Sequence, residues 1–204
     1  MNDVTAIILA GGCSLRLGED KTALTLGDRS LLQIALDLAA QIAPERIVVV
    51  REGQSVSADA ADVRVVTDLL SGGGPLVALL SGLQAARSAR CFVMACDTPF
   101  LRPVVAQALL EHAPEADVVV PRSADGLHPL LGVYAVRCAE AIRRELAEGR
   151  RRVVSFYRHV RVIEVDAETL RPLDPHLLSL FNLNTPGDYA RAREIIACRP
   201  SSAW

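Results

Sequence analysis

Residues 5–21 read TAIILAGGCSLRLGEDK, a largely apolar run that stops at two adjacent glycines. The run predicts a buried strand, and Gly11 and Gly12 predict a flexible loop of backbone amides at its carboxyl end. Arg16 and Lys21 add two positive charges to the same loop. Because amide, guanidinium and ammonium groups all bind phosphate oxygens, the stretch indicates an anion site after the first strand of an α/β fold.

Two standard phosphate-binding loops do not fit this stretch. It contains no GxGxxG, and Gly18 is followed by Glu19 where a P-loop needs lysine. An ordinary turn with a surface pair of Asp20 and Lys21 remains the alternative to a phosphate site, since short glycine motifs match by chance.

The rest of the chain alternates strands with helices. Further apolar runs predict buried strands at 47–50, 63–67, 91–96, 116–121, 131–136 and 160–165. Helical patterns follow at 31–42, from Pro75 onward, and at 103–112, 139–148 and 186–197, with Ser30 as the first N-cap. This alternation predicts a layered α/β sheet with helices on both faces. We expect one domain over residues 1–198 and a disordered tail at 199–204.

Composition and charge argue against several classes of protein. A formal net charge of −2 over 204 residues argues against a general nucleic-acid binder. The apolar runs are too short for a membrane span or a signal peptide, so we expect a cytoplasmic protein with no membrane partner. The five cysteines, at 13, 91, 96, 138 and 198, form no CxxC pair and no cluster with zinc spacing, which indicates reduced thiols.

Three groups of residues follow directly on predicted strands: Gly11 with Gly12, Asp68, and Asp97. Open α/β sheets bind ligands beyond the carboxyl ends of their strands, so we expect these residues to share a pocket. Asp97 is a candidate for Mg²⁺, which usually takes one or two carboxylates plus substrate phosphates. The alternative for both aspartates is that they cap turns.

Later segments carry further polar candidates. His128, in DGLHPLLGVY, could serve as an acid or base, although a lone loop histidine is more often structural. Asn182 and Asn184, in FNLNTPGDYA, offer amide groups, and Thr185 before Pro186 predicts a helix cap.

Taken together, these segments resemble a known family. LAGGCSLRLGEDK is similar to the LAGGxSxRMGxDK signature of nucleotidyltransferases that activate small substrates with an NTP. GGGPLVALLSGL, ACDTPFL, HPLLGVY, GRRRVVSFY and FNLNTPGDYA resemble, in the same order, segments of the molybdenum cofactor guanylyltransferases of the MobA family. Sugar-phosphate and cytidylyl-transferring relatives share the first motif. The combination of all these motifs, from about Ala6 to Tyr189, is more specific for the guanylyltransferases.

The resemblance implies a Rossmann-like three-layer α/β/α nucleotidyltransferase fold with a mostly parallel, mixed central sheet. It implies an Mg²⁺-dependent enzyme that transfers GMP from GTP to Mo-molybdopterin and releases pyrophosphate. GTP and Mo-molybdopterin are then the substrates. The enzyme that supplies the pterin and the molybdoenzymes that receive the product are candidate protein partners.

The resemblance also assigns roles to individual residues, with Mg²⁺ on Asp97. The implied catalytic residues are Arg16, Lys21 and Asp97. The implied nucleotide-binding residues are Leu9, Ala10, Gly11, Gly12, Ser14, Lys21, Asp68, Gly74 and Asp97. The candidates for the pterin side are His128, Arg152, Asn182 and Asn184. The chain departs from the family pattern at Arg51, where asparagine is frequent, and at Ala78, where the usual GPLAG has glycine.

Two other functions stay open on the sequence. One is a nucleotidyltransferase with another base or acceptor, such as a molybdopterin cytidylyltransferase or a sugar-phosphate enzyme. The preferred base of the nucleotide would distinguish these enzymes from a guanylyltransferase. The other is a non-catalytic paralogue that binds nucleotide or molybdopterin without turnover. Arg16, Lys21 and Asp97 count against the second, because a pure binder needs no metal carboxylate beside a triphosphate.

Overall fold

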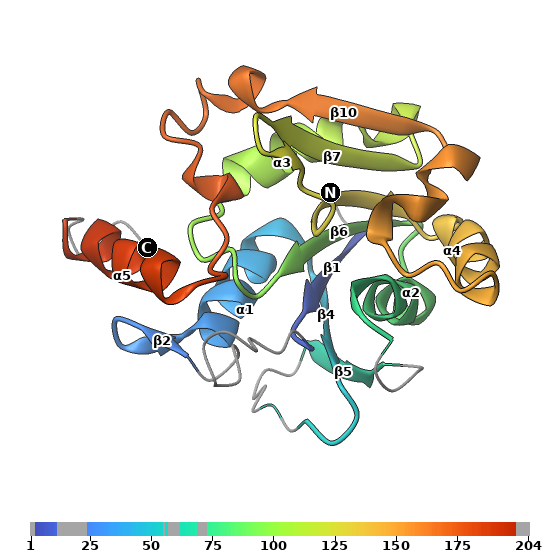
Figure 1. The fold of residues 1–204 in the computed structure, drawn as a ribbon, viewed down its shortest axis with the longest axis horizontal. Helices are drawn as coiled ribbons and strands as arrows, with labels where there is room; N and C mark the ends of the chain where they lie inside the picture. Colours follow the sequence, from blue (N-terminus) through green and yellow to red (C-terminus); the bar gives the residue numbers. More distant parts are fainter. Residues whose placement is uncertain (1–2, 12–23, 55, 57–61, 69–72, 199–204) are drawn as a thin grey trace.

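An eight-stranded sheet forms the centre of the protein in a computed structural model that describes residues 3–11, 24–54, 56, 62–68 and 73–198. Its strands are β1 (Val4–Leu9), β4 (Glu45–Val50), β5 (Val63–Thr67), β6 (Arg90–Ala95), β7 (Val118–Ser123), β8 (Gly126–Leu127), β9 (Leu131–Ala135) and β10 (Val162–Asp166). Seven of them run in the order β10-β7-β9-β6-β1-β4-β5, and β8 pairs with β7 (Figure 1).

The sheet is mixed and mostly parallel. β1 lies between β4 and β6 and is parallel to both, β5 is parallel to β4, and β10 is parallel to β7. β9 is antiparallel to its neighbours β6 and β7. Ile7 and Ile8, which point to opposite faces of β1, are both fully buried, as expected for a strand covered on both sides.

Helices cover both faces of the sheet, which confirms the predicted three layers. They are α1 (Leu31–Ile42), α2 (Pro75–Ala85), α3 (Pro103–Glu111), α4 (Cys138–Ala147) and α5 (Pro186–Ala197), with short 3₁₀ helices at Ala113–Glu115, Val153–His159, Ala167–Leu170 and Leu178–Leu180. Leu32 of α1 and Leu109 of α3 share a core on one face. Leu79 of α2 and Ile142 of α4 share the core on the other, where the two helices lie side by side (Figure 1).

Local sequence accounts for the helix ends. Ser30 caps α1 by accepting a hydrogen bond from the Gln33 N–H at 3.1 Å, while the Gln33 side chain accepts from the Ser30 N–H. Thr185 caps α5 with Asp188 in the same reciprocal way. These caps confirm the predictions for Ser30 and Thr185.

Several boundaries differ from the prediction. β7 lies two residues later than expected, β10 begins at Val162 and α4 at Cys138. The pattern also missed the hairpin of β2 (Thr25–Leu26) and β3 (Arg29–Ser30) and the 3₁₀ helix Val153–His159, because neither carries a long periodic repeat. The hairpin lies beside α5 (Figure 1), where a third small core joins Leu26, Leu31, Ile34, Phe100, Leu183 and Ala192.

Cysteine usage agrees with the predicted reduced state. None of the described cysteines forms a disulfide bond, and Cys91, Cys96 and Cys138 are buried. Burial raises the pKa of the Cys91 and Cys138 thiols to about 12, so they remain protonated packing residues. No helix in the described part of the chain has the length and apolar sequence needed to cross a membrane.

Candidate functional site

Four parallel strands end at the same edge of the sheet. Leu9, the last residue of β1, pairs with Val49 of β4 on one side and with Ala95 of β6 on the other. The segments that leave these strands and β5 carry Gly11, Arg51, Asp68 and Asp97. The structure therefore places the three predicted groups, represented by Gly11, Asp68 and Asp97, along one edge.

Backbone and side-chain hydrogen bonds hold the start of the glycine loop. The Ala10 N–H donates to the Val49 carbonyl at 2.8 Å, which extends the β1–β4 ladder beyond the strand. Gln54 donates from Nε2 to the Ala10 carbonyl at 3.3 Å, and its Oε1 accepts from the Arg51 N–H at 3.2 Å. The sequence pattern did not single out Gln54, because a lone glutamine in a polar loop carries no signal.

Gly11 packs closely against Arg51. A Cβ atom at this position would lie 3.0 Å from Arg51 Cγ and 3.7 Å from Asp68 Oδ2. The residue therefore allows the backbone after β1 to approach the side chains that follow β4 and β5. Gly12, Ser14, Arg16 and Lys21, the other loop candidates, lie outside the described residues.

Asp68 and Arg51 form a half-buried polar pair at this edge. Burial raises the pKa of the Asp68 carboxyl to about 6, and the nearby Arg51 guanidinium only partly offsets this. Asp68 Oδ1 and Arg51 Nε are both buried and have no hydrogen-bond partner among the described residues. Because buried polar atoms are normally satisfied, the pair points to a polar ligand or ordered water between the strand ends.

The raised pKa of Asp68 predicts a pH-dependent effect on stability. The pKa rises from an ordinary value of 3.8 to about 6 on folding, so the wild type loses stability as pH rises through this range. Asparagine carries no charge, so we expect Asp68→Asn to raise Tm by roughly 2–4 °C relative to the wild type at pH 8 and by none at pH 4. Thermal unfolding followed by circular dichroism, with exposed Asp125→Asn as control, measures this. An equal shift at both pH values would contradict it.

Two glycines shape the amino end of α2. A Cβ atom at Gly73 would lie 2.5 Å from Val77 Cγ2, and Gly74, the N-cap, has a φ of 75° that favours glycine. Pro75 occupies the first turn, as predicted. Gly74 is exposed, which leaves the amino end of α2 open to a negatively charged ligand. Ala78, one of the two departures from the family pattern, packs in the core between α2 and the sheet.

Asp97 lies in the turn after β6 and contacts a segment from the far end of the chain. Its backbone carbonyl accepts a hydrogen bond from the Leu183 N–H at 2.9 Å. Leu183 is buried between Asn182, which is half-buried, and Asn184, which is exposed. The two predicted asparagines therefore flank the residue that is bonded to the Asp97 turn.

His128 reaches the same edge because β9 runs antiparallel to β6. Leu131 pairs with Met94 near the end of β6, and the Leu131 N–H donates to the His128 carbonyl at 3.0 Å. His128 Nε2 lies 2.8 Å from Ser123 Oγ, and burial lowers the pKa of the imidazole. The side chain is therefore neutral near pH 7 and held by a hydroxyl.

Arg152 lies on a different element from the other candidates for the pterin side. It is exposed and precedes the 3₁₀ helix Val153–His159, which packs beside α4. Its neighbour Arg150 is held by the buried Glu145, with Nε 2.5 Å from Oε2.

The Asp97 carboxylate fits a metal site whose remaining ligands come from water and substrate phosphates. The described residues contain no group of three His, Cys, Asp or Glu side chains arranged to hold a metal ion by themselves. Mg²⁺ commonly takes one or two carboxylates and completes its shell with water and substrate phosphates. A single half-buried carboxylate at the strand edge suits that mode of binding.

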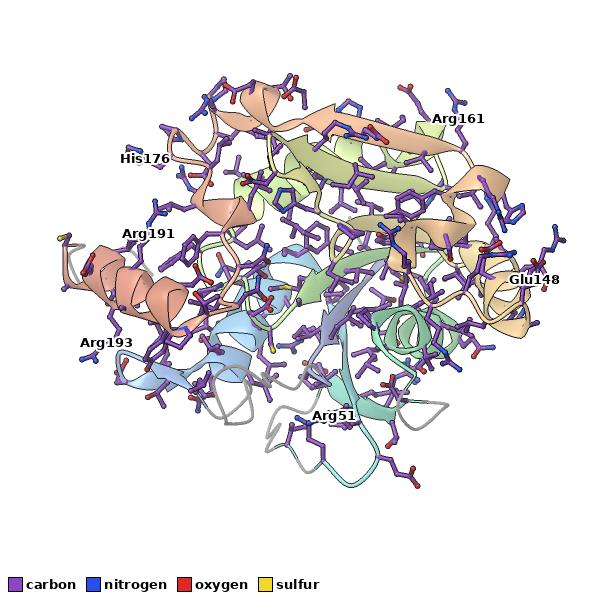
Figure 2. The ribbon with its side chains drawn as sticks, viewed as in Figure 1. Arg51, Glu148, Arg161, His176, Arg191 and Arg193 are labelled. Atoms are coloured by element: carbon purple, nitrogen blue, oxygen red, sulfur yellow. The ribbon has the colours of Figure 1, made fainter. Side chains whose placement is uncertain are left out.

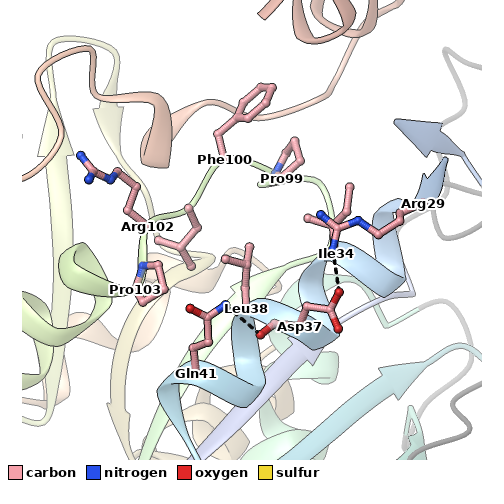
Figure 3. Close-up of a pocket in the computed structure, with 10 residues that line it drawn as sticks. Arg29, Ile34, Asp37, Leu38, Gln41, Pro99, Phe100, Arg102 and Pro103 are labelled. Carbon is pink, nitrogen blue, oxygen red and sulfur yellow. Dashed lines mark hydrogen bonds and ion pairs between the residues drawn. The ribbon is translucent and has the colours of Figure 1, made fainter. Parts of the chain in front are cut away.

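A separate cavity of about 210 Å³ lies between α1 and residues 99–103 (Figure 3). Its polar side chains are already paired, because Arg29 contacts the Asp37 carboxylate at 2.7 Å and Gln41 donates to the Asp37 carbonyl at 3.3 Å. Its lining residues lie in β3, α1 and the 99–103 segment. We therefore distinguish this cavity from the candidate site at the strand edge.

A family model described as the MobA-like NTP transferase domain matches residues 6–162. The chain belongs to this family. It is therefore a nucleotidyltransferase, and the match covers the ends of β1, β4, β5 and β6 with Gly11, Asp68 and Asp97. Asn182 and Asn184 of this MobA-like chain lie beyond the matched range.

Curated proteins and a solved structure resemble the chain over nearly its full length. It is 37% identical to the "Probable molybdenum cofactor guanylyltransferase" of Pelotomaculum thermopropionicum, covering 95% of this chain and 93% of that one. It is 34% identical to the "Molybdenum cofactor guanylyltransferase" of Desulfosudis oleivorans, covering 96% and 97%. The crystal structure of "Molybdopterin-guanine dinucleotide biosynthesis protein A" from Archaeoglobus fulgidus has a TM-score of 0.85 at 28% identity, covering 96% and 100%. The shared architecture confirms the predicted nucleotidyltransferase fold.

Proposed function

We propose that the chain is a molybdenum cofactor guanylyltransferase that transfers GMP from GTP to Mo-molybdopterin and releases pyrophosphate. The observation that carries this proposal is the placement of Gly11, Asp68 and Asp97 along one strand edge, with the Asn182–Asn184 segment bonded to the Asp97 turn. The names of the two curated relatives support the same activity.

GTP would lie over the carboxyl ends of β1, β4 and β5. Leu9 ends the first strand and Ala10 and Gly11 follow it, and the close approach at Gly11 would place its backbone amide beside the bound nucleotide. The exposed amino end of α2 at Gly74 favours negative charge. In this proposal Arg16 and Lys21, with Gly12 and Ser14, complete the phosphate contacts.

Mo-molybdopterin would lie on the side of β6 and β9, against His128, Asn182 and Asn184, with Arg152 as a further cationic candidate. Asparagine amides both donate and accept, which suits the polar edge of a pterin. The neutral imidazole of His128 can likewise donate or accept a hydrogen bond without a charge to neutralise.

The transfer requires positioning more than covalent help from side chains. The acceptor phosphate is ionised at neutral pH, so it needs no general base to attack the α-phosphorus of GTP. Mg²⁺ held by Asp97 and the substrate phosphates would neutralise charge that builds on the triphosphate. Arg16 and Lys21 would then stabilise the pyrophosphate leaving group.

Nucleotide binding followed by turnover tests the proposal. We expect calorimetry with Mg²⁺ to show tighter binding of GTP than of CTP or ATP by at least about tenfold. We also expect one pyrophosphate released for each guanine dinucleotide formed from GTP and Mo-molybdopterin. Preference for CTP would favour the cytidylyltransferase alternative, and binding without product would favour the non-catalytic paralogue.

A further inference from the structure

We propose that Tyr134 and Tyr157 are positioning residues that hold His128 for contact with the acceptor substrate. This rests on the proposed function, since that function places His128 against the pterin. The starting observation is a chain of hydroxyl groups in which Tyr134 Oη donates to the Pro129 carbonyl at 2.5 Å and lies 2.8 Å from Tyr157 Oη. Pro129 directly follows His128, so the chain ends at the residue next to the imidazole.

The direction of this chain follows from the number of hydrogen atoms. A carbonyl oxygen only accepts, so the single hydroxyl hydrogen of Tyr134 goes to Pro129. Tyr157 therefore donates to the Tyr134 oxygen, which can still accept. Tyr134 is fully buried in β9, where the loss of one hydroxyl would leave its partners unsatisfied. The order Tyr157, Tyr134, Pro129 satisfies both hydroxyl groups and the carbonyl.

The Pro129 carbonyl lies at the centre of a tight turn. The Leu131 N–H donates to the His128 carbonyl at 3.0 Å, which closes a β-turn with Pro129 at its second position. The direction of the central carbonyl is what distinguishes the two common types of this turn. Tyr134 holds that carbonyl and thereby fixes the backbone that carries the imidazole.

The imidazole of His128 is held through one ring nitrogen. Nε2 lies 2.8 Å from Ser123 Oγ, and the His128 N–H donates to the Pro121 carbonyl at 2.9 Å. Because Nε2 is already bonded, a substrate can bond to the ring through Nδ1. Burial lowers the pKa of the imidazole, and the Asp125 carboxylate only partly offsets this. The ring therefore meets the pterin uncharged near pH 7, able to donate or accept one hydrogen bond.

Tyr157 is itself fixed by the element that carries it. It lies in the 3₁₀ helix Val153–His159, and Arg158 of this helix contacts the fully buried Glu145 carboxylate of α4 at 2.6 Å. Glu148, at the end of α4, lies across the view from α5 (Figure 2). The tyrosine chain thus connects the His128 turn to an anchor in α4, on the side of the molecule away from α5.

A double-mutant cycle on the full chain tests the inference. We expect Tyr134→Phe to raise the KM for Mo-molybdopterin roughly tenfold and to leave the Kd for GTP unchanged, because the lost hydroxyl loosens only the His128 turn. His128→Ala should raise the same KM, and adding Tyr134→Phe to it should cause no further loss. Tyr189→Phe removes a hydroxyl on α5 that bonds to the Thr25 carbonyl. It is the matched control and should change neither constant.

NMR titration of the histidine side chains gives a readout that needs no substrate. We expect the pKa of His128 to lie below 6.5 in the wild type and to return toward 6.5 in Tyr134→Phe, since a loosened turn exposes the ring to water. The His128→Ala variant identifies the His128 resonance, which is absent from its spectrum. A tyrosine that only stabilised the sheet would leave this titration unchanged.

The outcomes separate this inference from the proposed function. Additive effects of Tyr134→Phe and His128→Ala, or an unchanged titration of His128, would overturn the inference, while GMP transfer by the wild type keeps the proposed function. A wild type without transfer overturns both. If Tyr134→Phe does not fold, Tyr157→Phe removes only the first donor of the chain. We then expect the same changes with a KM raised roughly threefold, and unchanged GTP binding shows that the variant is folded.

Discussion

Replacing Asp97 with asparagine is expected to lower the rate of guanylyl transfer on the order of 100-fold or more. Asp97 is the half-buried carboxylate in the turn after β6, beside the segment that carries Asn182 and Asn184. Asparagine keeps the size of the side chain but removes the negative charge that a hard divalent cation prefers. Initial rates of pyrophosphate release from GTP and Mo-molybdopterin, measured across Mg²⁺ concentrations, check this.

The matched control is Asp62→Asn. Asp62 is an exposed aspartate whose contact with Arg46, at 3.3 Å, is of the kind that contributes little to stability. We expect this variant to react at the wild-type rate. We also expect Asp97→Asn to unfold at nearly the wild-type temperature, so that a loss of rate is not a loss of fold. Wild-type turnover by Asp97→Asn at limiting Mg²⁺ would refute the metal role.

The second large effect concerns stability. Gly132→Ala is expected to lower the free energy of unfolding by about 3 kcal/mol. Gly132 lies in β9, between β6 and β7, and a Cβ atom there would lie 2.3 Å from the Val119 carbonyl oxygen and 2.9 Å from Val120 Cγ1. The first neighbour is backbone of a paired strand, so it cannot rotate away as a flexible side chain could. Urea unfolding followed by circular dichroism measures the change.

Gly187→Ala provides the contrast for this prediction. Gly187 lies in the first turn of α5, where an added Cβ would meet only Thr185 Oγ1 at 3.6 Å, an ordinary contact. We expect this variant to be neutral or more stable by roughly 0.5 kcal/mol, because alanine favours the helix and restricts the unfolded chain. Equal denaturation midpoints for the two alanine variants would show that β9 does not pack against β7 as described.

Local patterns were enough to predict most of the elements and the outline of the site. The apolar run ending at Leu9, the cap at Ser30 and the proline at the start of α2 each depend on residues a few positions apart. The same holds for the positions of Asp68 and Asp97 directly after strands. Short-range sterics and hydrogen bonding decide these features, so they can be predicted without knowledge of the fold. The 3₁₀ helix Val153–His159 was not predicted, because its sequence has no repeating apolar pattern.

By itself, the sequence determined the alternation of strands and helices, the glycine loop after the first strand and the order of the family's motifs. Only the tertiary structure placed β9 antiparallel beside β6, which brings His128 to the edge that carries Asp97. It alone joined Leu183 to the Asp97 turn and set Arg51 beside Asp68 with buried, unpartnered atoms. The difference is physical: local patterns depend on neighbouring residues, whereas strand order, burial and a shifted pKa depend on how distant segments pack around one core.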